Sequence, residues 1–176
     1  MTIFTDGSCA PNPGPGGFGV VVYNEDDIII DCYAHQEEMT TNNRMELKAI
    51  IYATIKYGIK ITNEDTFVNN IPVVYSDSYY CVQALTKWMF TWAQNEWKTT
   101  RNELIENLDL IKMYYDLYQK GYRIDLRKIK GHEGIEGNEV ADQLATGRKK
   151  VKDILKYEKI LLDRKEKEKE KEKING

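Results

Sequence analysis

Hydrophobic residues recur along the first part of the chain in short runs that predict β-strands. β-Branched and aromatic residues are frequent over residues 2–8, 18–23 and 28–35, which is typical of strands. A stretch rich in Pro and Gly over residues 11–17 and a polar stretch over residues 24–27 separate the three runs, and both compositions favour turns. Three consecutive strands joined by turns predict an antiparallel meander.

The spacing of apolar residues then changes to a helical period. A helix is predicted over about residues 44–57, with capping side chains at residues 41–43 and a natural end at Gly58. A continuous apolar run over residues 72–76 predicts a buried strand, and a further helix is expected over about residues 78–87.

The last part of the predicted domain repeats this alternation. An aromatic segment over residues 88–92 leads to a predicted helix over roughly residues 103–119, and an imperfect alternation predicts a strand over residues 122–130. A glycine-rich loop over residues 131–137 then opens a helix that carries residues 138–144. This order predicts an α/β fold whose five-stranded mixed sheet, three antiparallel strands and then two more, is flanked by helices.

Composition indicates one globular domain followed by a charged extension. A chain of 176 residues, 41% of them hydrophobic, can bury one substantial core, and the predicted elements place this domain over residues 1–148. Over residues 149–176 an apolar stripe at helical spacing gives way to alternating Lys and Glu at residues 165–173. Because the alternating stretch has no core-forming residues, the extension is expected to be a solvated helix or a disordered tail.

Composition also argues against several classes of protein. No run of about 20 apolar residues is present, so no membrane-spanning helix is expected. The N-terminal residues lack the basic and apolar regions of a secretory signal. Cys9, Cys32 and Cys81 are odd in number and widely separated, which argues against a disulfide framework or a zinc site and favours reduced thiols in the cytoplasm. A monomer is the default expectation.

The net charge gives no direct support for binding to nucleic acid. It is −3 for the whole chain, and because residues 164–173 hold six basic and four acidic residues, the remainder is more acidic still, at −5. An acidic surface binds a polyanion where bound cations neutralise clustered carboxylates. Any binding of nucleic acid is therefore expected to depend strongly on cations.

Four acidic residues lie where buried neighbours are predicted. Asp6 and Asp77 end apolar strands, whereas Glu46 and Asp142 lie on helices that must face the sheet. Each acid alone is explained as a cap, a turn residue or a partner of the helix dipole, but a lone buried acid is costly unless it is paired or binds a metal. Four carboxylates carry −4 and two Mg²⁺ ions carry +4, and oxygen-only ligation suits Mg²⁺ or Mn²⁺ and disfavours zinc.

Five motifs around these acids resemble the type 1 ribonuclease H family. They are TDGSC followed by NPGPGGFG from residue 5, TNNRMEL from residue 41, SDS from residue 76, KGH from residue 130 and GNEVAD from residue 137. The resemblance runs in order from about residue 1 to residue 147 and does not include the tail. It implies a ribonuclease H-like fold and an endonuclease that hydrolyses the RNA strand of RNA/DNA hybrids, leaving 3′-hydroxyl and 5′-phosphate ends.

The resemblance assigns roles to the four acids. The family's metal-binding carboxylates match Asp6, Glu46, Asp77 and Asp142, which would hold two Mg²⁺ ions, or Mn²⁺ in their place. Asp6 would bridge the two ions of a two-metal-ion mechanism. Glu46 and Asp77 would favour the ion on the leaving-group side, and Asp142 the ion on the nucleophile side.

Two further catalytic residues are implied by the resemblance. His132 matches the mobile-loop histidine that assists catalysis or product release, and the glycines on both sides of it give the loop freedom to move. Glu139 matches a glutamate near the nucleophile-side ion, although a favourable position at the start of a helix explains it equally well. The other histidine, His35, is interpreted as an ordinary surface residue of a strand.

Other matches concern the hybrid, whose two strands differ in their 2′-hydroxyls. Gly7, Ser8 and Cys9 are small enough for the backbone to come close to a sugar. Matches to family residues that contact bases or backbone in the minor groove are Asn12, Asn42 and Asn43. Tyr80 and Trp92 match the channel for the DNA sugar, and Thr41 and Asn107 match a phosphate pocket. Core packing explains the two aromatic residues as well, and turn or capping chemistry explains the asparagines.

Two differences from the family concern the affinity for the substrate. Met39 stands where many members have an arginine, and residues 93–103, which form a strongly basic segment in some relatives, contain two basic and two acidic residues. Because phosphate contacts dominate affinity, weaker hybrid binding is expected here than in relatives with the basic segment.

Three alternatives stay open at the level of the sequence. The first is another nuclease or transferase of the same fold, of the integrase-like or junction-resolving kind, which also uses clustered acids and two metals. The second is a non-catalytic domain that binds nucleic acid, and the third is a domain of a larger reverse transcriptase. The TNNRMEL motif and the Gly-His loop argue against the first, and the presence of all four acids argues against the second.

Overall fold

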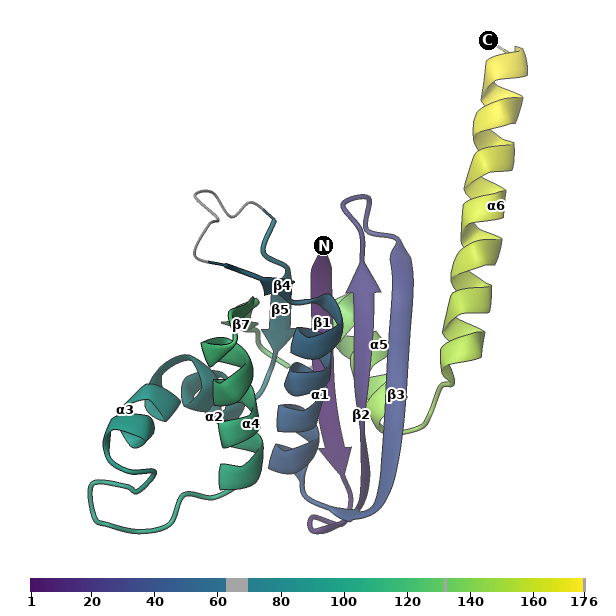
Figure 1. The fold of residues 1–176 in the computed structure, drawn as a ribbon. Coiled ribbons are helices and arrows are strands. Elements are labelled where there is room, and N and C mark those ends of the chain that lie inside the picture. The colour runs from purple at the N-terminus through teal and green to yellow at the C-terminus, as the bar shows by residue number, and fades with distance from the viewer. Residues whose placement is uncertain (63–69, 132, 176) are drawn as a thin grey trace.

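A central sheet carries helices on both faces, and a long C-terminal helix projects from the body (Figure 1). The computed structural model describes residues 1–62, 70–131 and 133–175. Within these residues the main sheet has five strands, antiparallel at one side and parallel at the other. The predicted α/β fold with a five-stranded mixed sheet is confirmed.

The strand order places the first strand in the middle of the sheet. β1 (Thr2–Cys9), β2 (Gly14–Tyr23) and β3 (Ile29–Thr40) form the antiparallel meander. β5 (Val73–Ser76) pairs in parallel with the other edge of β1, and β7 (Asp125–Lys128) pairs in parallel with β5. Because β1 and β5 run in the same direction, the residues at their C-terminal ends approach each other.

The run of valines in β2 is buried because both faces of the sheet are covered. Val20 and Val22 belong to the larger core, under helices α1 (Asn42–Tyr57) and α4 (Leu108–Gln119). Val21 belongs to a second core on the opposite face. Side chains alternate between faces along a strand, so a continuous apolar run is what a strand between two helical layers requires.

The remaining helices complete the two layers. α2 (Tyr79–Gln83), the π-helical turn η1 (Ala84–Trp88) and α3 (Met89–Gln94) follow one another directly and pack with the larger core. α5 (Glu136–Ala145) covers the opposite face, against β1 and β2. The carboxylate-bearing elements therefore come from the sheet and from both helical layers.

The strand expected over residues 122–130 is divided. β6 (Tyr122–Arg123) pairs with β4 (Ile59–Lys60) in a separate two-stranded sheet, and β7 then joins the main sheet. The predicted single strand was wrong in this respect, because a second pairing partner far away in the sequence takes the first two residues.

Other boundaries differ from expectation. β2 begins at Gly14, inside the expected turn, because glycines fit where strands approach closely: a Cβ at Gly17 would lie 2.3 Å from the Gln36 side chain. β3 continues past residue 35 to Thr40. The helix expected from residue 103 begins later, after the left-handed backbone of Asn107 (φ 56°). The aromatic segment over residues 88–92 is helical.

The C-terminal extension forms a helix in the described residues, α6 (Val151–Asn175). Its first turns pack on β3: Ile154 is buried in the second core, and the Glu158 carboxylate accepts a hydrogen bond from the Ile29 backbone N–H at 3.2 Å. The rest of α6 leaves the body (Figure 1). In the part of the chain that the structure describes, no helix has the length and apolar character needed to cross a bilayer. The division into domains at residue 148 stays a prediction.

Candidate metal centre

Three carboxylates from three elements meet at the end of the parallel strands. Asp6 is on β1, Asp77 follows the last residue of β5, and Glu46 is on α1. One carboxylate oxygen from each lies within 4.8 Å of the others. Asp6 and Glu46 are each only 7% exposed, and Asp77 is half-buried. The arrangement of strand ends that the sequence predicted therefore brings these three acids together.

The absence of a side chain at Gly7 allows α1 to approach β1. A Cβ at Gly7 would lie 2.2 Å from the Glu46 backbone nitrogen and 2.6 Å from the Met45 carbonyl carbon. Both atoms belong to the helix backbone, so a side chain here would force the helix away from the strand. Gly7 thus fixes the separation between Asp6 and Glu46.

Burial and mutual repulsion hold protons on the two most buried acids. The pKa of Asp6 is raised to about 8, first by burial and then by the charges of Asp77 and Asp142, while hydrogen bonding from Glu46 and Gly7 opposes the rise. The pKa of Glu46 is raised well above its ordinary value, first by burial and then by the charges of Asp6 and Asp77. A divalent cation would remove both costs, because it attracts the ionised forms.

An unpartnered oxygen supports a cation site at this point. Glu46 Oε2 is buried and has no hydrogen-bond partner among the described residues. Buried carboxylate oxygens are normally paired or bound to a metal. The donors of the cluster are all carboxylate oxygens, which is the ligand type of Mg²⁺ and Mn²⁺. The residues present therefore fit a hard divalent cation.

Asp142, the fourth predicted acid, does not belong to this group of three. It lies on α5, close enough for its charge to raise the pKa of Asp6. Its Oδ2 accepts a hydrogen bond from Arg148 Nη2, in an ion pair. In the described residues, Asp142 is thus a neighbour of the cluster that already has a cationic partner.

The two other predicted catalytic residues have different outcomes. His132 lies outside the described residues. Its neighbour Gly131 lies against the cluster, because a Cβ there would be 2.4 Å from Asp77 Oδ2. Glu139 is exposed in the first turn of α5, and its catalytic role stays a prediction. His35 is half-buried rather than fully at the surface, with its ring centroid 5.4 Å from that of Phe18.

The predicted contacts to the RNA strand lie on the β1–β2 turn and at the start of α1. Asn12 Oδ1 accepts a hydrogen bond from the Asn42 backbone N–H at 3.2 Å, which ties the turn to the helix. Asn42 is exposed, whereas Asn43 and Ser8 are half-buried. The Cys9 thiol is buried and points to the Pro11 carbonyl oxygen at 3.2 Å, so its side chain faces the protein interior.

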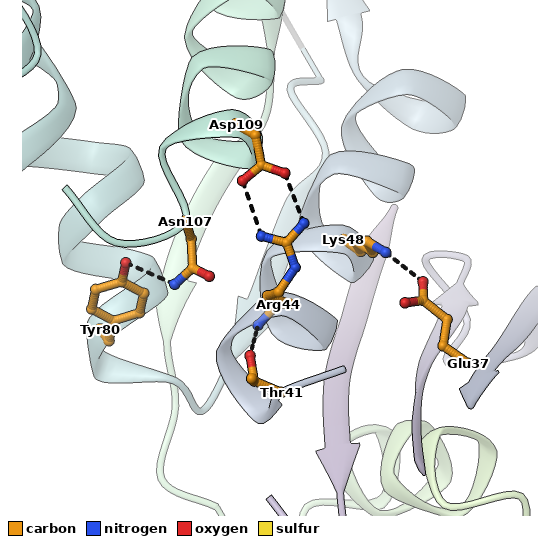
Figure 2. A network of polar contacts seen from close by, with 7 residues as sticks. All are labelled: Glu37, Thr41, Arg44, Lys48, Tyr80, Asn107 and Asp109. Carbon is orange, nitrogen blue, oxygen red and sulfur yellow. Dashed lines mark hydrogen bonds and ion pairs between the residues drawn. The ribbon is translucent and has the colours of Figure 1, made fainter. Parts of the chain in front are cut away.

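Three of the four predicted contacts to the DNA strand, Thr41, Tyr80 and Asn107, lie near the starts of α1, α2 and α4 (Figure 2). Asn107 Nδ2 donates a hydrogen bond to the Tyr80 hydroxyl at 3.3 Å. Thr41 caps α1 by accepting a hydrogen bond from the Arg44 backbone N–H. Figure 2 also shows two residues that the sequence did not single out: the Arg44 guanidinium donates to both Asp109 carboxylate oxygens, at 2.9 and 2.7 Å.

Trp92 has a mixed environment. It packs against the larger core and against Trp88, with ring centroids 5.9 Å apart, yet it stays half-buried. A hollow of about 520 Å³ adjoins it, lined also by Lys98 and Thr99. Trp92 thus packs on the core as one interpretation predicted, and its place in the channel for the DNA sugar stays a prediction.

A mixed sheet with a buried cluster of carboxylates at the end of its parallel strands fits the metal-dependent hydrolysis of phosphodiester bonds, and comparison with known proteins identifies the family. The family model described as RNase H matches residues 1–150. A ribonuclease H of Orientia tsutsugamushi is 37% identical over 85% of this chain and 82% of its own length, and a ribonuclease HI of Haemophilus ducreyi is 40% identical over 82% and 87%. The chain belongs to the ribonuclease H family.

A solved structure supports the same assignment. LC9-RNase H1, described as a type 1 RNase H with the type 2 active-site motif, superposes with a TM-score of 0.66 at 32% identity, covering 82% of this chain and 69% of its own. The suspected resemblance to type 1 ribonucleases H is thereby confirmed, and the protein is a hydrolase of phosphodiester bonds.

The close approach at Gly7 gives a first testable prediction. Gly7→Ala is expected to destabilise the fold by about 1–3 kcal/mol, because the added methyl group overpacks against the backbone of α1. Cleavage activity is expected to fall more than stability suggests, because Glu46 is displaced from Asp6. Denaturant unfolding and cleavage rates measure the two effects. Ser8→Ala, the next position of the strand, is a stability control and is expected to change the free energy of unfolding by less than about 0.5 kcal/mol.

Proposed function

We propose that this protein is an endonuclease that hydrolyses the RNA strand of RNA/DNA hybrids with two Mg²⁺ ions, leaving 3′-hydroxyl and 5′-phosphate ends. The observation that carries the proposal is the buried cluster of Asp6, Glu46 and Asp77, in which Glu46 Oε2 has no partner among the described residues. Membership of the ribonuclease H family supports the reaction class. Mn²⁺ could replace Mg²⁺, because both ions prefer oxygen ligands.

The proposed metal ligands are Asp6, Glu46, Asp77 and Asp142. When bound, two such ions activate a water molecule for in-line attack and stabilise the oxygen that leaves. The protein supplies the positions of the acids: Glu46 acts on Asp6 through a hydrogen bond, and Asp77 and Asp142 act on it through their charges. Asp6 would therefore help to hold both ions. Asp142 would reach the nucleophile-side ion after giving up its contact with Arg148. His132 is proposed to assist catalysis or product release, and Glu139 is proposed to act near the nucleophile-side ion.

Selectivity for the hybrid would come from two groups of residues, one for each strand. Towards the RNA strand, the small residues Gly7, Ser8 and Cys9 allow the backbone to approach a sugar, and Asn12, Asn42 and Asn43 supply polar groups for the minor groove. Glu46 would accept a hydrogen bond from the 2′-hydroxyl at the cleavage site. Towards the DNA strand, Tyr80 and Trp92 would border the sugar and Thr41 and Asn107 would bind a phosphate.

Three coarser parts of the proposal follow from the sequence. Residues 1–148 would form the catalytic domain, and residues 149–176 would act as a charged helical extension. The protein would act as a monomer in the cytoplasm on an RNA/DNA hybrid. Membrane attachment forms no part of the proposed activity.

Strand-specific cleavage tests this function directly. An RNA/DNA hybrid labelled on one strand at a time is incubated with Mg²⁺, with and without a chelator, and with the parent protein or Asp77→Asn. Cleavage of the RNA strand alone, lost with the chelator and strongly reduced in the variant, is the expected result. Cleavage of duplex DNA instead would favour an integrase-like or junction-resolving nuclease. A hybrid that is bound but stays intact would favour a non-catalytic binding domain.

A further inference from the structure

Arg148 occupies a position from which it competes with a cation for Asp142. Its Nη2 donates to Asp142 Oδ2 in an ion pair, and its Nε donates to the Thr146 hydroxyl at 2.9 Å. The Thr146 hydroxyl in turn donates to the Asp142 backbone carbonyl at 2.7 Å. The guanidinium is thus held by two contacts, both within the last turn of the helix that carries Asp142.

The end of α5 directs Arg148 back over the helix. Gly147 has a left-handed backbone (φ 72°), which reverses the chain directly after the helix and favours glycine. The Gly147 N–H donates to the Leu144 carbonyl, closing the turn. This reversal brings Arg148, six positions after Asp142, back to the Asp142 side chain.

The charges at this helix end favour a cation. Asp142 lies three residues before the end of α5, where the partial negative charge of the helix C-terminus makes an acid unfavourable. Arg148 offsets this effect, and a divalent cation bound by Asp142 would do the same. The two cations therefore compete for one carboxylate.

We propose that Arg148 is the counter-ion that Asp142 exchanges for a divalent cation, so that Arg148 sets the concentration at which the second cation binds. The inference rests on the proposed function, since it assigns Asp142 to one of two ions. Asp6, Glu46 and Asp77 have no comparable basic partner among the ion pairs of the described residues, so the exchange applies to the Asp142 ion and leaves the other ion unaffected.

The exposure of the two side chains to solvent limits how strongly Arg148 competes with a cation for Asp142. The Arg148 side chain is 61% exposed and that of Asp142 is 19% exposed. Exposed ion pairs contribute modestly and are screened by salt. Removing Arg148 is therefore expected to tighten binding of the Asp142 ion by about two- to fivefold, and the difference should shrink as the KCl concentration rises.

Mn²⁺ binding measured by electron paramagnetic resonance tests the exchange without substrate. The parent, Arg148→Gln, Asp142→Asn and the double variant are titrated, and the binding constant that Asp142→Asn removes is taken as that of the Asp142 ion. Arg148→Gln is expected to strengthen Mn²⁺ binding at the Asp142 site and to leave binding of the other ion unchanged. In the Asp142→Asn background, adding Arg148→Gln is expected to leave Mn²⁺ binding unchanged. Lys149→Gln, which removes an equal charge one residue further on, is the matched control and should have a smaller effect.

Several results would contradict the exchange. If Asp142→Asn removes no bound ion, or if Arg148→Gln and Lys149→Gln act equally, Arg148 is not a specific counter-ion. If Arg148→Gln weakens hybrid binding while both Mn²⁺ constants stay the same, Arg148 contacts a phosphate instead. In each case a parent protein that still cuts the RNA strand leaves the proposed reaction intact, although the first result would withdraw Asp142 from the metal ligands. A parent that binds no Mn²⁺ and cuts nothing would overturn both the reaction and the exchange.

Discussion

Asp6→Asn is expected to lower the rate of hybrid cleavage by about a thousandfold or more and, at the same time, to stabilise the cation-free protein. Activity falls because Asp6 is the proposed bridge between two cations. Stability rises because Asn is neutral and similar in shape, whereas Asp6 must bind a proton to stay buried beside Glu46 and Asp77. With a folded pKa of about 8 against an ordinary 3.8, the gain near neutral pH should be about 2–4 kcal/mol.

The opposite signs of the two effects distinguish a cation site from a structural role. Cleavage is measured under saturating hybrid, and unfolding is measured in chelator by urea denaturation. Asp26→Asn removes the same charge from an exposed turn and is the control. It is expected to change the free energy of unfolding by less than about 0.5 kcal/mol and to leave the cleavage rate close to that of the parent. A loss of stability in Asp6→Asn would mean that Asp6 makes structural contacts more valuable than the repulsion that it relieves.

The second large effect is a fall in the stability of the cation-free protein as pH rises. Asp6 has a folded pKa of about 8, so between about pH 4 and pH 8 the folded state keeps a proton that the unfolded state has lost. The free energy of unfolding is therefore highest below the unfolded pKa of 3.8 and falls as pH rises from about 4 to about 8. The fall is up to about 1.4 kcal/mol per pH unit for each proton that the folded state keeps and the unfolded state has lost. The raised pKa of Glu46 acts in the same direction.

Saturating Mg²⁺ should remove or reverse the fall of the free energy of unfolding with rising pH, because the bound ion favours the ionised carboxylates. Urea unfolding at several pH values between about 5 and 8, with Mg²⁺ or with chelator, measures both slopes. Asp6→Asn should flatten the slope in chelator. A stability that is constant over this range without any cation would mean that both acids titrate in the folded protein as they do in the unfolded chain.

The acidic cluster could be predicted because its determinants are local. Asp77 follows the last residue of a recognisable strand, and Glu46 lies in a helix with clear periodicity. Asp6 was expected to end its strand; β1 instead continues to Cys9, but Asp6 lies just past the residues that pair with β5, so elementary rules for α/β sheets still bring the three together. Their chemistry follows from residue type. The five-stranded mixed sheet was likewise predicted from the alternation of elements and the family resemblance, whereas the strand order β3-β2-β1-β5-β7 was seen only in the structure.

Features that depend on distant or unusual pairings could not be predicted. Arg44 and Asp109 are 65 residues apart, and nothing in either local sequence indicates that their helices meet. The Arg148 ion pair requires the left-handed turn at Gly147, whose direction is evident only in the folded chain. Division of the strand expected over residues 122–130 depends on β4, two residues long and itself without a sequence signal.

The π-helical turn η1 determines which aromatic residues share a face. Tyr80 and Trp92 are twelve positions apart, and at about 100° per residue a regular α-helix would place them about 120° apart around its axis. A π-turn accommodates one additional residue, which reduces the offset to about 20°. Trp88 then lies between the two, with ring centroids 6.2 Å from Tyr80 and 5.9 Å from Trp92. One additional residue in η1 thus places the rings of Tyr80, Trp88 and Trp92 in one continuous row. Deleting one residue of η1 would rotate Trp92 away from the surface proposed for the DNA strand.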